Sequence, residues 1–364
     1  MAPASLRPAI PAVRALAPLA LLAAVALWLA GVALRDVYLF DTLTGRVGLR
    51  DTAATVVSNL TSFTSPYYTV SLESEGAVRR LQRWRRTSAG PDRRVEVERV
   101  AASAGPGADV LVYRPTRPAP PPPGGSVPLV LFVHGGSFAF GSGEYPMARD
   151  LAADLGVPVV SVDVSPAPQS KCPTQVNEVL GVRRWLAEEG VAKRVTGRTG
   201  NLDVVLMGDD TGGTIAASVA QASARDPRTR FSMQVLVAPV LRAAGATEAY
   251  LRAPRALPET AWMWRAYVDA TVPGAAACEP GLGEVPRASP KALIVTGSRD
   301  VFAEEARQYA DRLDAAARGQ GQLKVTRVTA HATHAGVLWR RDNGDRWWRA
   351  VIQALQSHFG VPRG

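Results

Sequence analysis

The chain has 364 residues, 47% of them apolar, which is enough for one large α/β domain with a hydrophobic core and additional segments. Its 42 basic and 32 acidic residues give a net charge of +10, but only four of the basic residues are lysines. This general arginine bias comes without a nucleic-acid-binding motif or a basic and aromatic repeat, which argues against a nucleic-acid partner.

The first predicted element is a helix over 15–34, a run of apolar residues without a charge. At about 1.5 Å per residue, a helix of this length crosses a bilayer once. Arg7 and Arg14 precede the run and favour a cytosolic N-terminus, with the following domain on the lumenal or extracytoplasmic side of an endoplasmic-reticulum-like or plasma membrane. A signal peptide cleaved near Ala33 is the alternative, whereas the length of the run favours an uncleaved signal anchor.

Residues 35–107 carry mixed signals. Asn59 begins a glycosylation sequon, which is consistent with a secretory route. The basic stretch 78–86 is either a helix that lies against anionic headgroups or a solvated face. Residues 93–100 alternate between apolar and polar in the manner of a strand.

Two strands follow, one over 110–115 and one directly before His134, joined by the proline-rich stretch 115–126. Such a stretch is extended and semi-rigid, and we interpret it as a long hairpin loop within one sheet rather than a domain linker. After the second strand, Gly135 and Gly136 expose backbone N–H groups that can hold a developing oxyanion.

The most specific motif is VVLMGDDTGGT at 204–214, an apolar run that breaks into a glycine-rich turn. Gly208 and Gly212 flank Asp210 in the G-x-nucleophile-x-G pattern of a nucleophile elbow, where glycines permit a sharp strand-to-helix turn. Serine is the usual residue at the centre of this turn. The carboxylate of Asp210 therefore decides what chemistry is available.

Further residues are predicted to work with the elbow. The backbone N–H of Thr211 is expected to join Gly135 and Gly136 as an oxyanion donor. Asp300 ends the apolar run 291–300, and His334 lies just past another run. Nucleophile, acid and histidine in this order along the chain are typical of α/β-hydrolases.

From about residue 108 to 364 the chain resembles the hormone-sensitive-lipase-like α/β-hydrolases, which include the arylacetamide deacetylases. The family patterns HGGG, GDSAGG and HGF appear here as HGGS at 134–137, GDDTGG at 208–213 and HAG at 334–336. The resemblance implies a mostly parallel central sheet flanked by helices, with a helical cap, and catalytic positions at Asp210, Asp300 and His334. The expected organisation is a cytosolic tail (1–14), a transmembrane signal anchor (15–34), a juxtamembrane or cap segment (35–107) and an α/β-hydrolase domain (108–364).

The departures from the family pattern lie at chemically important positions. Asp210 replaces the nucleophilic serine, and Ser137 replaces the third glycine of HGGG. The family's Tyr-Arg-Leu-Ala-Pro-Glu segment is VSPAPQ at 164–169.

Several site residues have a second interpretation. His331 is the alternative to His334 as the histidine of the site, and Asp300 is also placed to cap a helix. The resemblance gives His134 a structural role in the oxyanion loop. Without an HExxH or CxxC motif, neither a metal nor another cofactor is expected.

The cysteines are too few for a disulfide framework. Cys172 and Cys278 are far apart in the chain, and although they can pair in an oxidising compartment, two buried free thiols are expected.

Three functional hypotheses remain open at this point. In the first, the Asp210 carboxylate attacks an sp³ carbon and His334, with Asp300, activates the water that cleaves the resulting ester. This set resembles epoxide hydrolases and haloalkane dehalogenases, and it needs an acid for the leaving oxygen. Three tyrosines are candidates for that acid: Tyr145, Tyr250 and Tyr267.

In the second hypothesis, carboxylic esters are hydrolysed through Thr211 or through general-base attack by water. The third is a ligand-binding protein without activity, for which the plant gibberellin receptors, which resemble this family, are the precedent. In each case the expected partners are a lipophilic small molecule and the membrane.

Overall fold

The computed structural model describes residues 78–79, 82, 90–105, 107–243, 256–269, 271, 275–318, 325–332, 334–339 and 346–362. The expected membrane helix at 15–34, the sequon at Asn59 and most of the basic stretch 78–86 lie outside these residues. Within the described part of the chain, no helix has both the length and the apolar character to cross a membrane. The chain divides into Met1–Val70 and Ser71–Gly364, and all described residues belong to the second unit.

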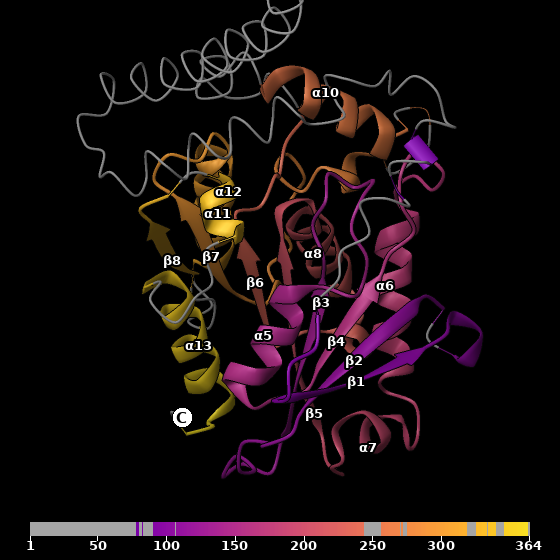
Figure 1. Cartoon of the computed structure of the whole chain (residues 1–364). Helices are drawn as coiled ribbons and strands as arrows, with labels where there is room; N and C mark the ends of the chain where they lie inside the picture. The colour runs from indigo at the N-terminus through magenta and orange to yellow at the C-terminus, as the bar shows by residue number, and fades with distance from the viewer. Residues whose placement is uncertain are drawn as a thin grey trace, which may run out of the picture. The chain divides into compact units, whose positions relative to one another are not determined.

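One eight-stranded sheet organises this unit, in the order β1-β2-β4-β3-β5-β6-β7-β8 (Figure 1). The strands are β1 (Val95–Val100), β2 (Asp109–Pro115), β3 (Val127–Val133), β4 (Val159–Asp163), β5 (Leu202–Asp209), β6 (Met233–Val237), β7 (Lys291–Gly297) and β8 (Val325–Ala330). β2 pairs antiparallel with β1 and with β4, whereas every pairing from β4 to β8 is parallel. The predicted α/β fold with a mostly parallel sheet is confirmed.

The sheet differs from the sequence prediction at its first strands. β2 and β3 do share the sheet, but they do not form a hairpin, because β4 inserts between them and pairs with both. The proline-rich stretch 115–126 therefore joins two strands that are separated in the sheet by β4. β1 is also part of this sheet, so the sheet begins before the domain boundary expected at residue 108.

Helices cover both faces of the sheet. They are α5 (Pro146–Leu155), α6 (Thr174–Trp185), α7 (Val191–Thr196), α8 (Asp210–Ser223), α10 (Ala256–Tyr267), α11 (Ala303–Ala317), α12 (His334–Trp339) and α13 (Arg346–Phe359), with short 3-10 turns η1 (Ala102–Ala104), η2 (Pro227–Thr229) and η3 (Ala275–Cys278). Alternate side chains of a strand point to opposite faces. In β3, Leu129 and Leu131 face the core shared with α6, α8 and α11, whereas Val130 and Phe132 face the core shared with α5 and α13. Burial on both faces explains why β3 is a continuous apolar run.

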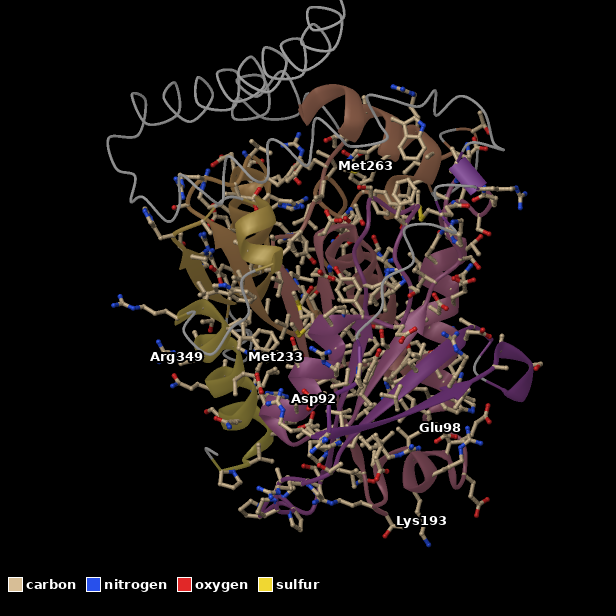
Figure 2. All side chains as sticks on the ribbon, viewed as in Figure 1. Asp92, Glu98, Lys193, Met233, Met263 and Arg349 are labelled. Carbon is tan, nitrogen blue, oxygen red and sulfur yellow. A yellow bond between two sulfur atoms is a disulfide. The ribbon has the colours of Figure 1, made fainter. Side chains whose placement is uncertain are left out.

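The prediction of free thiols is wrong. Cys172, just before α6, and Cys278, in η3, form a disulfide with their Cα atoms 6.1 Å apart (Figure 2). The N–H of Cys172 also donates to the carbonyl oxygen of Tyr267 at 2.9 Å, so the end of α10 is held to the same segment. The two cysteines are 106 residues apart in the chain, and only the tertiary fold brings them together.

Candidate active site

The predicted elbow lies at the C-terminal end of β5. β5 ends at Asp209 and α8 begins at Asp210, whose φ of 50° is in the left-handed region. That conformation is costly for a residue with a Cβ, and it is found where the surroundings enforce it. Asp210 therefore projects from a strained turn at the edge of the sheet where β3 and β7 also end. This edge is the usual ligand-binding position in parallel sheets.

The oxyanion loop follows β3 and contacts the elbow directly. The backbone N–H groups of Gly136 and Ser137 donate to Asp210 Oδ2 at 2.9 and 3.2 Å. Successive positive φ values of 124°, 54° and 61° at Gly136, Ser137 and Phe138 turn these amides toward the elbow. A carboxylate oxygen thus occupies the position between the donors where an oxyanion is held in a serine hydrolase.

Gly135 does not have the predicted role. Its N–H donates to Asp209 Oδ1 at 2.9 Å, so it is not directed at the elbow side chain. Its lack of a side chain is nevertheless required, because a Cβ there would lie 2.7 Å from Asp210 Cβ. Ser137, which stands at the position of the family's third glycine, supplies the second amide instead.

Thr211 reaches Asp210 through its side chain, whereas the sequence pointed to its backbone N–H. The Thr211 hydroxyl accepts the N–H of Phe138 at 3.1 Å and lies 3.3 Å from Asp210 Oδ2. Thr211 is 1% exposed, so its hydroxyl is shielded from solvent.

His334 joins the two aspartates. Its Nδ1 lies 3.0 Å from Asp300 Oδ2 and its Nε2 lies 3.3 Å from Asp210 Oδ1. The ring packs edge-on against Phe302, with the ring centroids 4.9 Å apart. The alternative histidine, His331, instead faces Ser298 and is exposed. The structure therefore brings Asp210, His334 and Asp300 together in one hydrogen-bonded series.

Asp300 is not the N-cap of α11, a position that Phe302 holds, but its carboxylate contacts the same segment. Its Oδ1 accepts the N–H of Phe302 at 2.9 Å, just before α11 begins, while Oδ2 remains with His334. The bond to Phe302 fixes the carboxylate plane and so orients the histidine.

The charges in this series support one another. Burial disfavours the charged form of His334, but Asp300 and Asp210 outweigh it and hold the pKa of the imidazole well above its usual value. Burial likewise opposes ionisation of Asp210, yet the hydrogen bond and charge of His334, with the amides of Gly136 and Ser137, lower the pKa of its carboxyl. Both shifts favour the ion pair of a His334 imidazolium with the Asp210 carboxylate.

Asp209 is a residue that sequence reasoning missed. It is fully buried beside the elbow, and its Oδ2 accepts the hydroxyl of Tyr145 at 2.7 Å while Oδ1 holds Gly135. Its place in a motif that was interpreted only through Asp210 hid this role. The contact also directs the Tyr145 hydroxyl to Asp209 rather than to a substrate.

Of the other two tyrosine candidates, the structure describes Tyr267. Tyr267, in α10, is fully buried, and its ring stacks on Phe138 with the centroids 3.8 Å apart. Burial raises the pKa of its hydroxyl. Tyr250 lies outside the described residues.

His134 is buried in the oxyanion loop with its Nδ1 2.8 Å from the carbonyl oxygen of Gly135, a contact within the loop itself.

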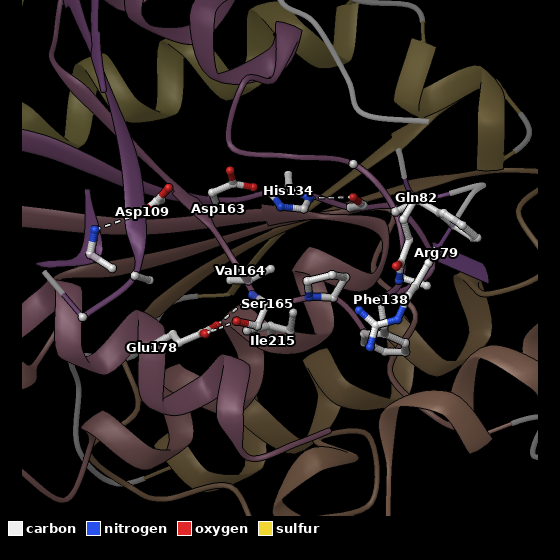
Figure 3. A pocket seen from close by; sticks show the side chains of 18 residues that line it. Arg79, Gln82, Asp109, His134, Phe138, Asp163, Val164, Ser165, Glu178 and Ile215 are labelled. Atoms are coloured by element: carbon white, nitrogen blue, oxygen red, sulfur yellow. Dashed lines mark hydrogen bonds between the residues drawn. The ribbon is translucent and has the colours of Figure 1, made fainter. Parts of the chain in front are cut away.

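A cavity of about 480 Å³ adjoins the oxyanion loop (Figure 3). Gly135 and Phe138 line it from the loop, and Ser165 and Glu178 line it from the segment after β4 and from α6. Neither Asp210 nor His334 is among its lining residues. Ser165 donates its N–H and hydroxyl to Glu178, while burial raises the pKa of that carboxyl. The described residues contain no group of side chains arranged to hold a metal ion.

The chain belongs to the α/β hydrolase fold family. The sequence model of this family matches residues 130–335, which is more than half of the chain. This confirms the esterase family expected from the motifs. An ethyl acetate hydrolase from Pseudomonas putida is 28% identical over 69% of this chain and 78% of its own length. A gibberellin receptor from Arabidopsis thaliana is 27% identical over 57% of this chain and 64% of the receptor.

Solved structures show the same fold. An esterase/lipase from an uncultured bacterium superposes with a TM-score of 0.63 over 82% of this chain and 97% of that chain, at 14% identity. At that identity the similarity concerns the fold alone.

Proposed function

We propose that the protein hydrolyses a lipophilic substrate at an electrophilic sp³ carbon, epoxide-like in its reactivity, with Asp210 as the nucleophile. One observation carries this proposal. Asp210 Oδ2 is held by the amides of Gly136 and Ser137, while Oδ1 lies on the side of His334. The two oxygens of one carboxylate thus have different surroundings, as a nucleophile that later forms an ester requires.

The same geometry argues against an ordinary carboxylic ester as substrate. The carbonyl oxygen of such an ester needs the two amides that Asp210 already occupies. Carboxylate attack on it would also form a reactive anhydride, whereas attack on an sp³ carbon forms a stable ester.

The reaction then has two steps. Oδ1 of Asp210 bonds to the substrate carbon, and the bond to the leaving group breaks with its electron pair on that group. The ester is uncharged, so the pKa of His334 falls and the imidazolium releases its proton to solvent, from which the alkoxide of an opened epoxide takes one. Water then gives a proton to the neutral imidazole and attacks Cγ, and the carbonyl electron pair moves onto Oδ2. Collapse releases the alcohol, which takes the proton from His334, and the Asp210 carboxyl returns its own proton to the imidazole.

We also place the domain on the lumenal or extracytoplasmic side of a membrane, held by a signal anchor at 15–34. The uncharged run supports the anchor, and the Cys172–Cys278 disulfide supports an oxidising compartment. A membrane-bound site gives lipophilic substrates direct access.

A second candidate is a ligand-binding protein without activity. The hydrogen bonds among Asp210, His334 and Asp300 are satisfied without any substrate, and they fill the oxyanion hole. The same arrangement would result if the catalytic serine had been lost and the aspartate in its place merely filled the oxyanion hole. The similarity to a gibberellin receptor is compatible with it.

Trapping of the covalent intermediate tests the proposal. In His334→Gln the ester on Asp210 forms but is not hydrolysed, so styrene oxide or hexyl bromide adds one alkyl group to the protein, detected by intact mass and mapped to Asp210. His331→Gln is the matched control and turns over without an adduct, and Asp210→Ala forms none. If the folded His334→Gln protein stays unmodified across a panel of epoxides and alkyl halides, the binding function is the better account.

A further inference from the structure

Thr211 follows the elbow residue directly, and its hydroxyl lies between Asp210 and the oxyanion loop. The hydroxyl oxygen accepts the N–H of Phe138 at 3.1 Å and lies 3.3 Å from Asp210 Oδ2. Because a backbone N–H can only donate, the Phe138 contact uses a lone pair of the hydroxyl and leaves its proton free to be donated. An ionised carboxylate can only accept, so that proton is directed to Oδ2.

From this geometry we infer that the Thr211 hydroxyl is a third oxyanion donor, matched to a carboxylate at the elbow, and that it acts in hydrolysis of the Asp210 ester. This role rests on the proposed function. It makes Thr211 a catalytic residue, because it contacts the oxygen on which negative charge develops.

The substitutions at the elbow fit such a pairing. The pattern GDSAGG has alanine after the nucleophile, and this chain has GDDTGG. A serine nucleophile has one side-chain oxygen, whereas a carboxylate has two, and each accepts more than one hydrogen bond. Here His334 serves Oδ1, and the amides of Gly136 and Ser137 with the Thr211 hydroxyl serve Oδ2. Compared with the family pattern, the elbow therefore has an additional acceptor, Asp210 Oδ2, and an additional donor, the Thr211 hydroxyl, and the two form a hydrogen bond with each other.

The two steps of the reaction respond differently to this donor. In the first step the charge of the carboxylate disappears as the ester forms, so a donor on Oδ2 stabilises the reactant and gives no acceleration. In the second step water adds to Cγ and negative charge develops on Oδ2, where the donor stabilises the transition state. Loss of one oxyanion donor typically slows such a step about 100- to 1000-fold. Thr211 therefore favours hydrolysis of the ester and not its formation.

Single-turnover kinetics with styrene oxide separates the steps. We expect Thr211→Val to form the alkyl-enzyme at the wild-type rate or faster and to hydrolyse it about 100-fold more slowly, so that the adduct accumulates. Thr211→Ser keeps the hydroxyl and hydrolyses the ester within several-fold of wild type. Thr214→Val is the matched control, because Thr214 is a buried threonine of the same helix whose hydroxyl donates to the carbonyl oxygen of Val240 instead.

Two outcomes of this assay overturn the inference. One is wild-type hydrolysis by a folded Thr211→Val. The other is Thr211→Ser as slow as Thr211→Val, which would attribute the effect to packing of the methyl group. If His334→Gln and all the Thr211 variants stay unmodified, the proposed function itself fails.

A second measurement needs no activity. Thr211→Val is expected to lower the melting temperature in the wild type, and by less than half as much in an Asp210→Ala background, where only the Phe138 contact is lost. Equal shifts in the two backgrounds would show that the hydroxyl does not interact with Asp210, whatever the reaction.

Discussion

Asp210 Oδ2 lies 2.9 Å from the backbone nitrogen of Gly136, so the side chain of the elbow occupies the oxyanion hole of its own site. A serine side chain is shorter and carries no second oxygen, so it leaves that position to the substrate. The replacement of serine by aspartate therefore changes both the nucleophile and the space around it.

Asp210→Ser is expected to create esterase activity toward short acyl esters such as p-nitrophenyl acetate. The substitution restores a hydroxyl nucleophile and frees the amides of Gly136 and Ser137, while His334 and Asp300 remain. The activity should vanish in Asp210→Ser/His334→Ala and persist in Asp210→Ser/His331→Ala. A folded Asp210→Ser protein that is inert toward a broad ester panel would mean that these groups do not act as a triad.

Asp210→Asn is expected to lower the pKa of His334, because an adjacent opposite charge is removed. The raised pKa of His334 stabilises the folded state fully below the unfolded pKa, and this contribution is lost as the pH rises through the folded pKa. In the variant the folded pKa is lower, so this contribution should be smaller and its loss complete at lower pH. Histidine NMR titration and melting temperatures across pH measure both effects, with the resonance of exposed His331 as internal reference.

Glu305→Gln is expected to raise stability at alkaline pH. Burial raises the pKa of Glu305 to about 8, and its carboxylate accepts the N–H of Leu241 at 2.5 Å. Between the usual glutamate pKa of 4.5 and about 8, the folded state holds a proton that the unfolded chain releases, so stability falls as the pH rises through this window. Glutamine keeps the acceptor and removes the ionisation.

The measurement is the difference in melting temperature between Glu305→Gln and wild type, expected to be larger at pH 8 than at pH 5. Each kcal/mol corresponds to about 3 °C for a domain of this size. Glu304→Gln is the control, because Glu304 is a half-buried neighbour paired with Arg307. A parallel pH dependence in Glu305→Gln and wild type would contradict a buried protonated carboxyl.

The signal anchor is tested on the full chain. Residues 15–34 are expected to remain in the mature protein and to keep it in the membrane pellet after alkaline carbonate extraction, because the run is apolar and uncharged. N-terminal sequencing provides the check. A mature chain that starts near Leu34 would establish cleavage instead.

The strands and the order of the site residues could be predicted from the sequence, because each leaves a local pattern in it. Burial on both faces makes β3 and β5 continuous apolar runs, and the glycines around Asp210 mark a turn that few other structures require. Parallel strands end at one edge, so Asp300 and His334 were expected beside the elbow. In the structure, His334 forms hydrogen bonds with both Asp300 and Asp210.

Other features depend on atoms that no local pattern specifies. Which loop amide faces Asp210 follows from positive φ at Gly136, Ser137 and Phe138, and HGGS alone does not show that Gly135 is bound by Asp209 instead. β4 lies between β2 and β3 in the sheet although it follows both in the chain, and the local sequence of the strands does not specify this order. The disulfide joins residues whose distance in the chain says nothing of their distance in space.

The carboxylate at the elbow also determines how the protein responds to chemical reagents. Fluorophosphonates and similar phosphorylating probes label hydrolases by capturing an activated hydroxyl, and Asp210 offers them none. Thr211, the adjacent hydroxyl, is buried and already bonded to Phe138. A proteome surveyed for hydrolases with such probes would therefore pass over this chain, and an alkylating electrophile is the reagent suited to finding it.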